Sequence, residues 1–361
     1  MRMKRKLLWQ IPLLLFLVIG TIYIARQERN KPFQHNEGRI FGTTYHLTYQ
    51  HERDLQKEIE AELKKVDRSL SMFNDSSVIS HVNNGILDIP NSAEGKMFID
   101  VFQLATKISQ ETHGAFDITV APLVNAWGFG FKQGDMPSPQ SIDSLRQFVG
   151  FERVQLIANG RQHRIAKDDS RTMLDCSAIA KGYGTDVVAR YLRSRDVQNY
   201  MVEIGGEVVV NGNNERGEQW RIGVSKPIED PTSTSNELQT IISLPLSAAG
   251  DNASLQLKAL ATSGNYRNFY YKDGKRYAHT IDPRTGCPVQ HNILSATVLA
   301  PNCAIADAYA TSFMVMGLKE AQQILRRHPE LMAYLIYTDD NGNYAIWQSE
   351  EMKTADAAEN N

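Results

Sequence analysis

The chain has 361 residues, of which 42% are hydrophobic and 22% are charged, and its formal net charge at pH 7 is -2. This length and composition provide a core for one large or two medium domains. Because the sequence has no basic excess and no basic stripe, it argues against nucleic acid as the partner.

The first 27 residues have the pattern of a membrane anchor. Basic residues between positions 2 and 6 precede an apolar run from Leu7 to Ala25, which is close to the length that spans a bilayer. The run ends without a good small-residue cleavage site, which favours an uncleaved anchor over a cleaved signal peptide. Since the basic residues should stay cytoplasmic, we expect the remainder of the chain on the periplasmic side of a bacterial inner membrane.

The folded domain is expected over 38–348. Residues 28–37 are polar and are interpreted as a linker, and 349–361 are expected to be disordered. Within the domain, Gly38–Gln50 alternates like a first strand, and Asp54–Leu70 has helical spacing with many charges.

Three further segments have the apolar period of helices. They are Ala93–His113, Ile179–Leu192 with Ser177 as N-cap, and Cys303–Met316, and a fourth helix and two strands follow as far as Trp347. The alternation of such segments with strands, and the absence of any linker between them, predict an α+β protein. We expect mixed sheets flanked by helices in a single catalytic unit of one or two lobes.

Strand patterns lie between these helices. Tyr200–Asn211 and Trp220–Ser225 are rich in β-formers, and Asn268–Ile281 is typical of a hairpin that turns at Asp273-Gly274. The Gly205-Gly206 pair inside the first of these strands is interpreted as a bulge rather than a site.

Asp307 and Thr311 are four residues apart on a predicted helix, so a carboxylate and a hydroxyl share one face. Such oxygens are the ligands that Mg²⁺ prefers. The alternative is a buried aspartate that caps a turn beside a threonine bonded to its own helix.

The segment Asp175–Gly182 joins a loop to a helix and places Lys181 in the first helical turn. A helix N-terminus attracts phosphate through its free N–H groups, and a lysine there is unfavourable for the helix dipole unless an anion is nearby. The alternative is a solvated lysine on an amphipathic helix.

The segment His279–Gly286 leaves the predicted hairpin through an Asp282-Pro283 turn. This places His279 at a rim where a ligand can reach it, although a solvated histidine is the simpler interpretation. Upstream, Asp117 and Thr119 are expected on one side of a short strand, where that polar face could meet a ligand.

Eight segments in chain order, together spanning about Gly38 to Gly317, resemble the FAD:protein FMN transferase family (ApbE, flavin transferase). The matching segments are Gly42-Thr43, Ser71–Asn74, Gly114–Leu123, Asp175–Gly182, Glu203–Gly206, Thr262–Tyr266, His279–Gly286 and Asp307–Thr311. The chain departs from the family in carrying an anchor where many members are lipoproteins, and Phe41 where methionine is common.

The resemblance implies Mg²⁺-dependent transfer of FMN from FAD to a threonine hydroxyl of an acceptor flavoprotein, with a phosphoester bond formed and AMP released. It implies that the acceptor is an extracytoplasmic subunit of a sodium-pumping NADH:quinone reductase or a related electron-transfer complex. The site residues that it implies are Ala178 (through its carbonyl), Asp307 and Thr311 for Mg²⁺, and Asp117, Lys181, Ile281, Phe41 and Phe73 for FAD.

His279 is the candidate base for the incoming hydroxyl, because an imidazole with an ordinary pKa of about 6.5 suits proton transfer near neutral pH. Asp282 is the alternative that could share or replace it. With water as nucleophile, the same site would make a periplasmic FAD pyrophosphatase. A non-enzymatic, membrane-anchored flavin-binding protein is the third hypothesis, although such a protein has no need of a metal-type pair and a base.

Overall fold

The fold is that of a computed structural model. It describes residues 12–21, 31–130, 136–227, 237–247, 255–265, 269–272, 275–350 and 352. The predicted turn at 273–274, Tyr266 and nearly all of the expected C-terminal tail lie outside these residues.

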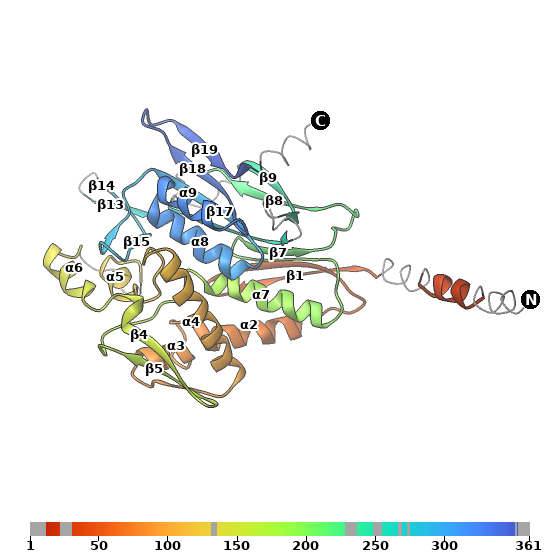
Figure 1. Cartoon of the computed structure of the whole chain (residues 1–361), viewed down its shortest axis with the longest axis horizontal. Coiled ribbons are helices and arrows are strands. Elements are labelled where there is room, and N and C mark those ends of the chain that lie inside the picture. Colours follow the sequence, from red (N-terminus) through yellow and green to blue (C-terminus); the bar gives the residue numbers. More distant parts are fainter. Residues whose placement is uncertain are drawn as a thin grey trace, which may run out of the picture.

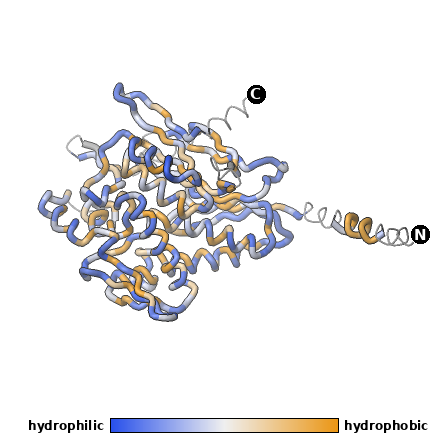
Figure 2. Tube along the Cα trace, in the orientation of Figure 1, coloured by the Kyte–Doolittle hydropathy of each residue, from blue (hydrophilic) through white to orange (hydrophobic). Residues whose placement is uncertain are grey.

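Residues 12–21 are the part of the expected anchor that the structure describes. They are helical and, apart from Thr21, apolar (Figure 2), and their large hydrophobic side chains are exposed, with Leu14 at 65% and Phe16 at 74%. No helix within the described ranges is long and apolar enough to cross a membrane. The anchor therefore stays a prediction from the sequence.

An eight-stranded sheet organises the domain (Figure 1). Every neighbouring pair in it is antiparallel. The prediction of a mixed sheet is therefore wrong for this sheet. In spatial order the strands are β1 (Phe33–Ile40), β2 (Thr43–Gln50), β6 (Tyr200–Ile204), β7 (Glu207–Asn211), β12 (Ala259–Gly264), β17 (Ile293–Ala300), β18 (Met332–Thr338) and β19 (Tyr344–Gln348).

Helices cover one face of this sheet, and a two-stranded ribbon packs near the other. The helices are α2 (Gln56–Leu70), α7 (Ala180–Ser194) and α8 (Cys303–Met316), and the ribbon is formed by β8 (Trp220–Ser225) and β9 (Leu238–Leu244). Helix α8 is apolar on nearly all sides, as expected of a helix buried in the middle of a core. It contacts the sheet through β12 and β17 and contacts α4 (Ala93–Glu111) beyond it.

A smaller lobe lies below the helices in Figure 1. It holds α3 (Val78–Asn83) and a three-stranded sheet of β3 (Asp88–Ile89), β5 (Gln162–Lys167) and β4 (Val154–Asn159). One continuous cluster of buried side chains joins this lobe to the large sheet, from Ile165 through Phe313 to Ala296. The two lobes therefore share one hydrophobic core.

The remaining elements are short. They are α5 (Ala121–Ala126), α6 (Pro139–Arg146), the 3-10 turn η1 (Phe151–Arg153), β10 (Leu246–Ser247), β11 (Gln256–Leu257), β13 (Phe269–Lys272), β14 (Lys275–Ala278), β15 (Ile281–Asp282), β16 (Cys287–Pro288) and α9 (Leu318–Arg327). The predicted hairpin over Asn268–Ile281 is confirmed as β13 and β14.

The N-terminal boundary differs from the expectation. The predicted linker, 28–37, overlaps β1, which begins at Phe33 and pairs with β2 along its whole length. A tight turn at Phe41-Gly42, with φ of 51° and 74°, divides the expected first strand into this hairpin. The sequence hid β1 because an edge strand can be polar on both faces and still be held by its backbone hydrogen bonds.

Two local predictions are wrong for reasons of hydrogen bonding. Ser177 does not cap α7, whose N-cap position is Ile179 without a side-chain bond. Asp117 and Thr119 do not lie in a strand: they form a turn in which the Thr119 N–H and hydroxyl both donate to Asp117 Oδ1, at 2.8 and 2.7 Å. Such a local side-chain bond competes with strand pairing.

Helices α7 and α8 bond to each other's first turns. Asp307 of α8 accepts the Gly182 N–H (3.0 Å), while Asp186 of α7 accepts the N–H groups of Cys303 and Ala304 (2.9 Å each). The backbones are so close that a Cβ on Gly182 would lie 2.4 Å from the Cys303 carbonyl oxygen. This reciprocal bonding fixes the start of α7 against the start of α8.

Protonation of Asp186 should make stability depend on pH. Burial raises the pKa of Asp186 to about 6, despite the two N–H groups that lower it. An unfolded aspartate titrates near pH 4. Burial of the charged form therefore lowers the free energy of unfolding by its full amount above pH 6, and this loss shrinks as pH falls and Asp186 takes up a proton. When the pH falls from 7 to 5, we expect the free energy of unfolding of the parent to rise by on the order of 1 kcal/mol relative to that of Asp186→Asn.

The measurement is urea denaturation of both proteins at a series of pH values. Asp117, whose pKa burial also raises to about 6, titrates in both proteins and cancels in the difference. Parallel pH curves for parent and variant would contradict the assignment.

Candidate functional site

A cavity of about 350 Å³ opens between the sheet, the starts of α7 and α8, and the segment that follows β14. Eight of the ten site residues predicted from the sequence line it, and two do not. Those in the lining are Phe73, Asp117, Ala178, Lys181, His279, Ile281, Asp307 and Thr311. The cavity therefore gathers residues from positions 73 to 311 of the chain.

Lys181 provides the one ammonium group among the described residues of the cavity lining, and it interacts with two carboxylates. Its Nζ donates to Glu207 Oε1, and Asp307 lies close enough to act on it electrostatically. Burial lowers the pKa of Lys181, but Asp307 and Glu207 together raise it by more, so the amine keeps its proton. The sequence analysis expected an anion near the lysine in this first helical turn, and the Glu207 and Asp307 carboxylates provide part of that negative charge.

Oxygen atoms suited to a hard cation lie on the same wall. The Asp307 carboxylate uses Oδ2 to accept the Gly182 N–H, and its Oδ1 accepts no hydrogen bond from the described residues. Thr311 and Ala178 add a hydroxyl and a carbonyl to the same lining. In the described part of the chain no group of three or more His, Cys, Asp and Glu side chains could hold a metal ion. A cation here would need neutral oxygens and a ligand's own oxygens to complete its shell.

Asp117 lies in the lining but is already engaged by the protein. Besides Thr119, its carboxylate accepts the Phe151 N–H at 2.8 Å, and only 7% of the residue is exposed. Burial raises its pKa to about 6, which these hydrogen bonds oppose. Asp117 therefore shapes the cavity wall through the turn that it closes.

His279 and Ile281 also line the cavity. The ring of Phe129 meets the His279 ring edge-on at 6.4 Å between centroids, and Tyr270 packs on Phe129 at 5.3 Å. Tyr277 stacks on Tyr270 in turn, at 5.5 Å. This aromatic row connects the β13–β14 hairpin to the cavity and fixes the place where His279 stands.

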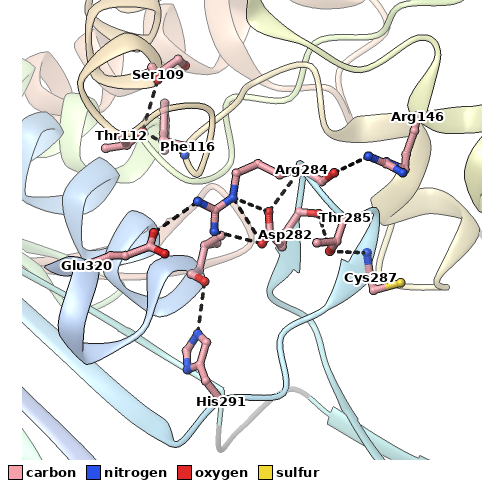
Figure 3. Close-up of polar contacts among 11 residues, drawn as sticks. Ser109, Thr112, Phe116, Arg146, Asp282, Arg284, Thr285, Cys287, His291 and Glu320 are labelled. Carbon is pink, nitrogen blue, oxygen red and sulfur yellow. Dashed lines mark hydrogen bonds and ion pairs between the residues drawn. The ribbon is translucent and has the colours of Figure 1, made fainter.

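Asp282 is not among the lining residues and forms an ion pair with Arg284 (Figure 3). The guanidinium Nε lies 3.0 Å from Asp282 Oδ1, and a second nitrogen lies 3.0 Å from Oδ2. Arg284 also reaches Glu320 of α9 at 3.2 Å, and Arg146 of α6 donates to the Arg284 carbonyl at 2.6 Å. The turn after His279 is therefore fastened to two helices, and the Asp282 carboxylate is occupied.

Phe41 is the other predicted residue outside the lining. It sits in the β1–β2 turn, and its ring packs so tightly on α7 that a Cβ on Gly184 would lie 2.6 Å from it. Phe73, by contrast, lines the mouth of the cavity and is 72% exposed.

The predicted site residues do not include Glu207, which directly follows the glycine pair interpreted from the sequence as a bulge. The pair at Gly205-Gly206, with φ of 62° and 100°, is instead the turn between β6 and β7, and it delivers Glu207 to the cavity wall. A signal was present: a charged residue among the valines of a predicted buried strand is unusual unless it has a partner.

Comparison with known proteins gives one consistent result. The ApbE family model matches residues 41–336. The FAD:protein FMN transferase of Haemophilus influenzae is 35% identical over 315 residues, which cover 84% of this chain and 86% of that protein.

Solved structures agree with this. The flavin transferase ApbE from Vibrio cholerae superposes with a TM-score of 0.72 at 34% identity, covering 90% of this chain and 99% of that one. The apo flavinyl transferase ApbE of Pseudomonas stutzeri gives 0.74 at 27% identity, covering 90% and 96%.

Arg284 should matter more for stability than its outer partner does. In Arg284→Ala the Asp282 carboxylate, whose side chain is only 13% exposed, loses its bidentate partner, and we expect a cost of about 1–3 kcal/mol. In Glu320→Ala only a pair with a 51% exposed carboxylate is lost, and we expect less than about 1 kcal/mol. Urea denaturation of both variants measures the difference, and equal costs would show that Asp282 does not depend on Arg284.

Proposed function

The chain belongs to the ApbE family and is a FAD:protein FMN transferase, and on this premise we propose a Mg²⁺-dependent transfer of FMN from FAD to a threonine hydroxyl of an acceptor flavoprotein. FAD is the donor substrate. AMP is the second product.

The acidic character of the cavity is the observation that carries the metal requirement. Its lining holds the carboxyl groups of Asp117, Asp175, Glu207 and Asp307, against one ammonium group, that of Lys181, among the described residues. A diphosphate that carries two negative charges would be repelled by this lining without a further positive charge.

Three oxygen donors fit such a cation. Asp307, Thr311 and Ala178 all line the cavity and carry a carboxylate, a hydroxyl and a backbone carbonyl, and a hard cation takes oxygens of this kind. Mg²⁺, when bound, supplies positive charge to the diphosphate and withdraws electron density from the phosphorus that is attacked.

The protein's own residues then have distinct tasks. The threonine oxygen forms a bond to the phosphorus of the FMN half, and the bond from that phosphorus to the oxygen bridging to AMP breaks, so that AMP leaves with the bridging oxygen. His279 takes the hydroxyl proton, and Lys181 stabilises the negative charge on the phosphate oxygens. Because Arg284 occupies Asp282, we assign the base to His279 rather than to Asp282.

We expect a covalent FMN adduct in a direct assay. The enzyme is incubated with FAD, Mg²⁺ and a recombinant flavoprotein subunit of a membrane electron-transfer complex of the sodium-pumping NADH:quinone reductase type. Mass spectrometry should find FMN on one threonine, and a Thr→Val acceptor should stay unmodified. Free FMN and AMP without an adduct would favour a FAD pyrophosphatase, and intact FAD would favour a flavin-binding protein.

The same assay separates the roles of two residues. Asp307→Ala should abolish the stimulation by Mg²⁺, as chelation with EDTA does in the parent, because one carboxylate is the charged ligand. His279→Ala should reduce transfer by about 10²-fold or more while FAD still binds. Equal activity of His279→Ala and the parent across pH would remove His279 as the base.

We also propose that residues 1–27 tether the enzyme to the inner membrane with its catalytic domain in the periplasm. The support is the basic start followed by the apolar run, part of which is an exposed apolar helix over 12–21. The full chain should sediment with membranes and be digested by protease added to spheroplasts. A chain lacking residues 1–27 should stay soluble, and recovery of the full chain in the cytosol would contradict the proposal.

A further inference from the structure

Glu207 is a buried carboxylate whose position no structural need explains. It is the first residue of β7, its residue exposure is 1%, and it lies in the lining of the cavity. Burying a charged carboxylate in a sheet is costly, and a buried ion pair is often no more stable than apolar residues of similar size. A valine, as at the next three positions, would suit the strand better.

The two oxygens of Glu207 have different surroundings. Oε1 accepts from Lys181 Nζ, whereas Oε2 is buried and has no hydrogen-bond partner among the described residues. Buried carboxylates that serve the fold alone have their oxygens satisfied, as Asp186 does with two N–H groups. The described part of the fold thus satisfies one oxygen of Glu207, through Lys181, and not the other.

Lys181 needs a fixed partner to act at one place. It carries its charge on a flexible four-carbon stem, and its side chain is 30% exposed to the cavity. It also lies in the first turn of α7, where the helix dipole repels a cation. Glu207, on the sheet below, offers the charge that keeps the ammonium group at the cavity floor beside Asp307.

We infer that Glu207 is a positioning residue, which holds the Lys181 ammonium group at the point in the cavity where the diphosphate of FAD reacts. The inference rests on the proposed function of the cavity. Glu207 acts through Lys181, and its own negative charge repels the phosphates. Its removal should therefore impair the reaction without weakening the binding of FAD.

The chain offers a matched control in the same hairpin. Glu203 of β6 also ends in a carboxylate near the Gly205-Gly206 turn, but it pairs with His46 at 2.7 Å and does not line the cavity. Glu203→Gln and Glu207→Gln remove the same charge from neighbouring strands on different faces. Only the second should affect the chemistry.

The test follows AMP release from FAD with Mg²⁺ and the acceptor flavoprotein by chromatography, together with FAD affinity by flavin fluorescence and the Tm of each protein. We expect Glu207→Gln to lower kcat about tenfold or more, with FAD bound as tightly as by the parent or more tightly. Glu203→Gln should match the parent in all three. The double variant of Glu207→Gln and Lys181→Met should be no slower than Lys181→Met alone, because the two residues act as a unit.

Three outcomes would overturn the inference. They are a parental kcat for Glu207→Gln, a double variant slowed by the product of the two single effects, and a loss of rate that only follows a fall in Tm and in FAD affinity. If Glu207→Gln does not fold, Glu207→Asp, which keeps the charge on a shorter side chain, takes its place in the same cycle. AMP release is measured whether FMN ends on threonine or on water, so failure of the transferase proposal is seen separately, as the missing adduct.

Discussion

The reciprocal bonding of α7 and α8 is the constraint on which the site depends. Each helix uses an aspartate to satisfy N–H groups in the other's first turn, and the glycine at position 182 lets the two backbones meet. Helix N-termini leave four N–H groups without partners, so a side chain from a neighbour that bonds them fixes both position and angle. The consequence is that Lys181 and Asp307, from distant parts of the chain, stand at one cavity wall.

This arrangement has an electrostatic cost that the function explains. Burial raises the pKa values of Glu207 and Asp307, and the nearby Lys181 ammonium group opposes that rise. A protein selected for stability alone would have little reason to bury two carboxyl groups beside one lysine. A site that binds an anionic substrate together with a cation benefits from such burial, because buried charged groups are held in fixed positions and are not screened by water.

The wall that carries His279 is built differently, by packing and by one guanidinium. Aromatic rings of the β13–β14 hairpin and of Phe129 hold one end of the segment, and Arg284 holds the other through Asp282 and Glu320. Phe73 is exposed at the mouth. The cavity thus combines a rigid polar floor with an aromatic side, which suits a ligand that has a charged diphosphate and a flat ring system.

Helical periodicity and short motifs are local properties, so the sequence predicted the long helices, the α+β class and eight residues that line the cavity. It failed where the outcome depended on partners far away in the chain. An edge strand at Phe33–Ile40 is held by β2, the Asp117 turn is closed by Phe151, and Asp282 is taken up by Arg284 and α9. The contact between Glu207 and Lys181 came from the tertiary structure. No period or spacing in the sequence tells which strand will place a carboxylate against a lysine of the helix that packs on the sheet.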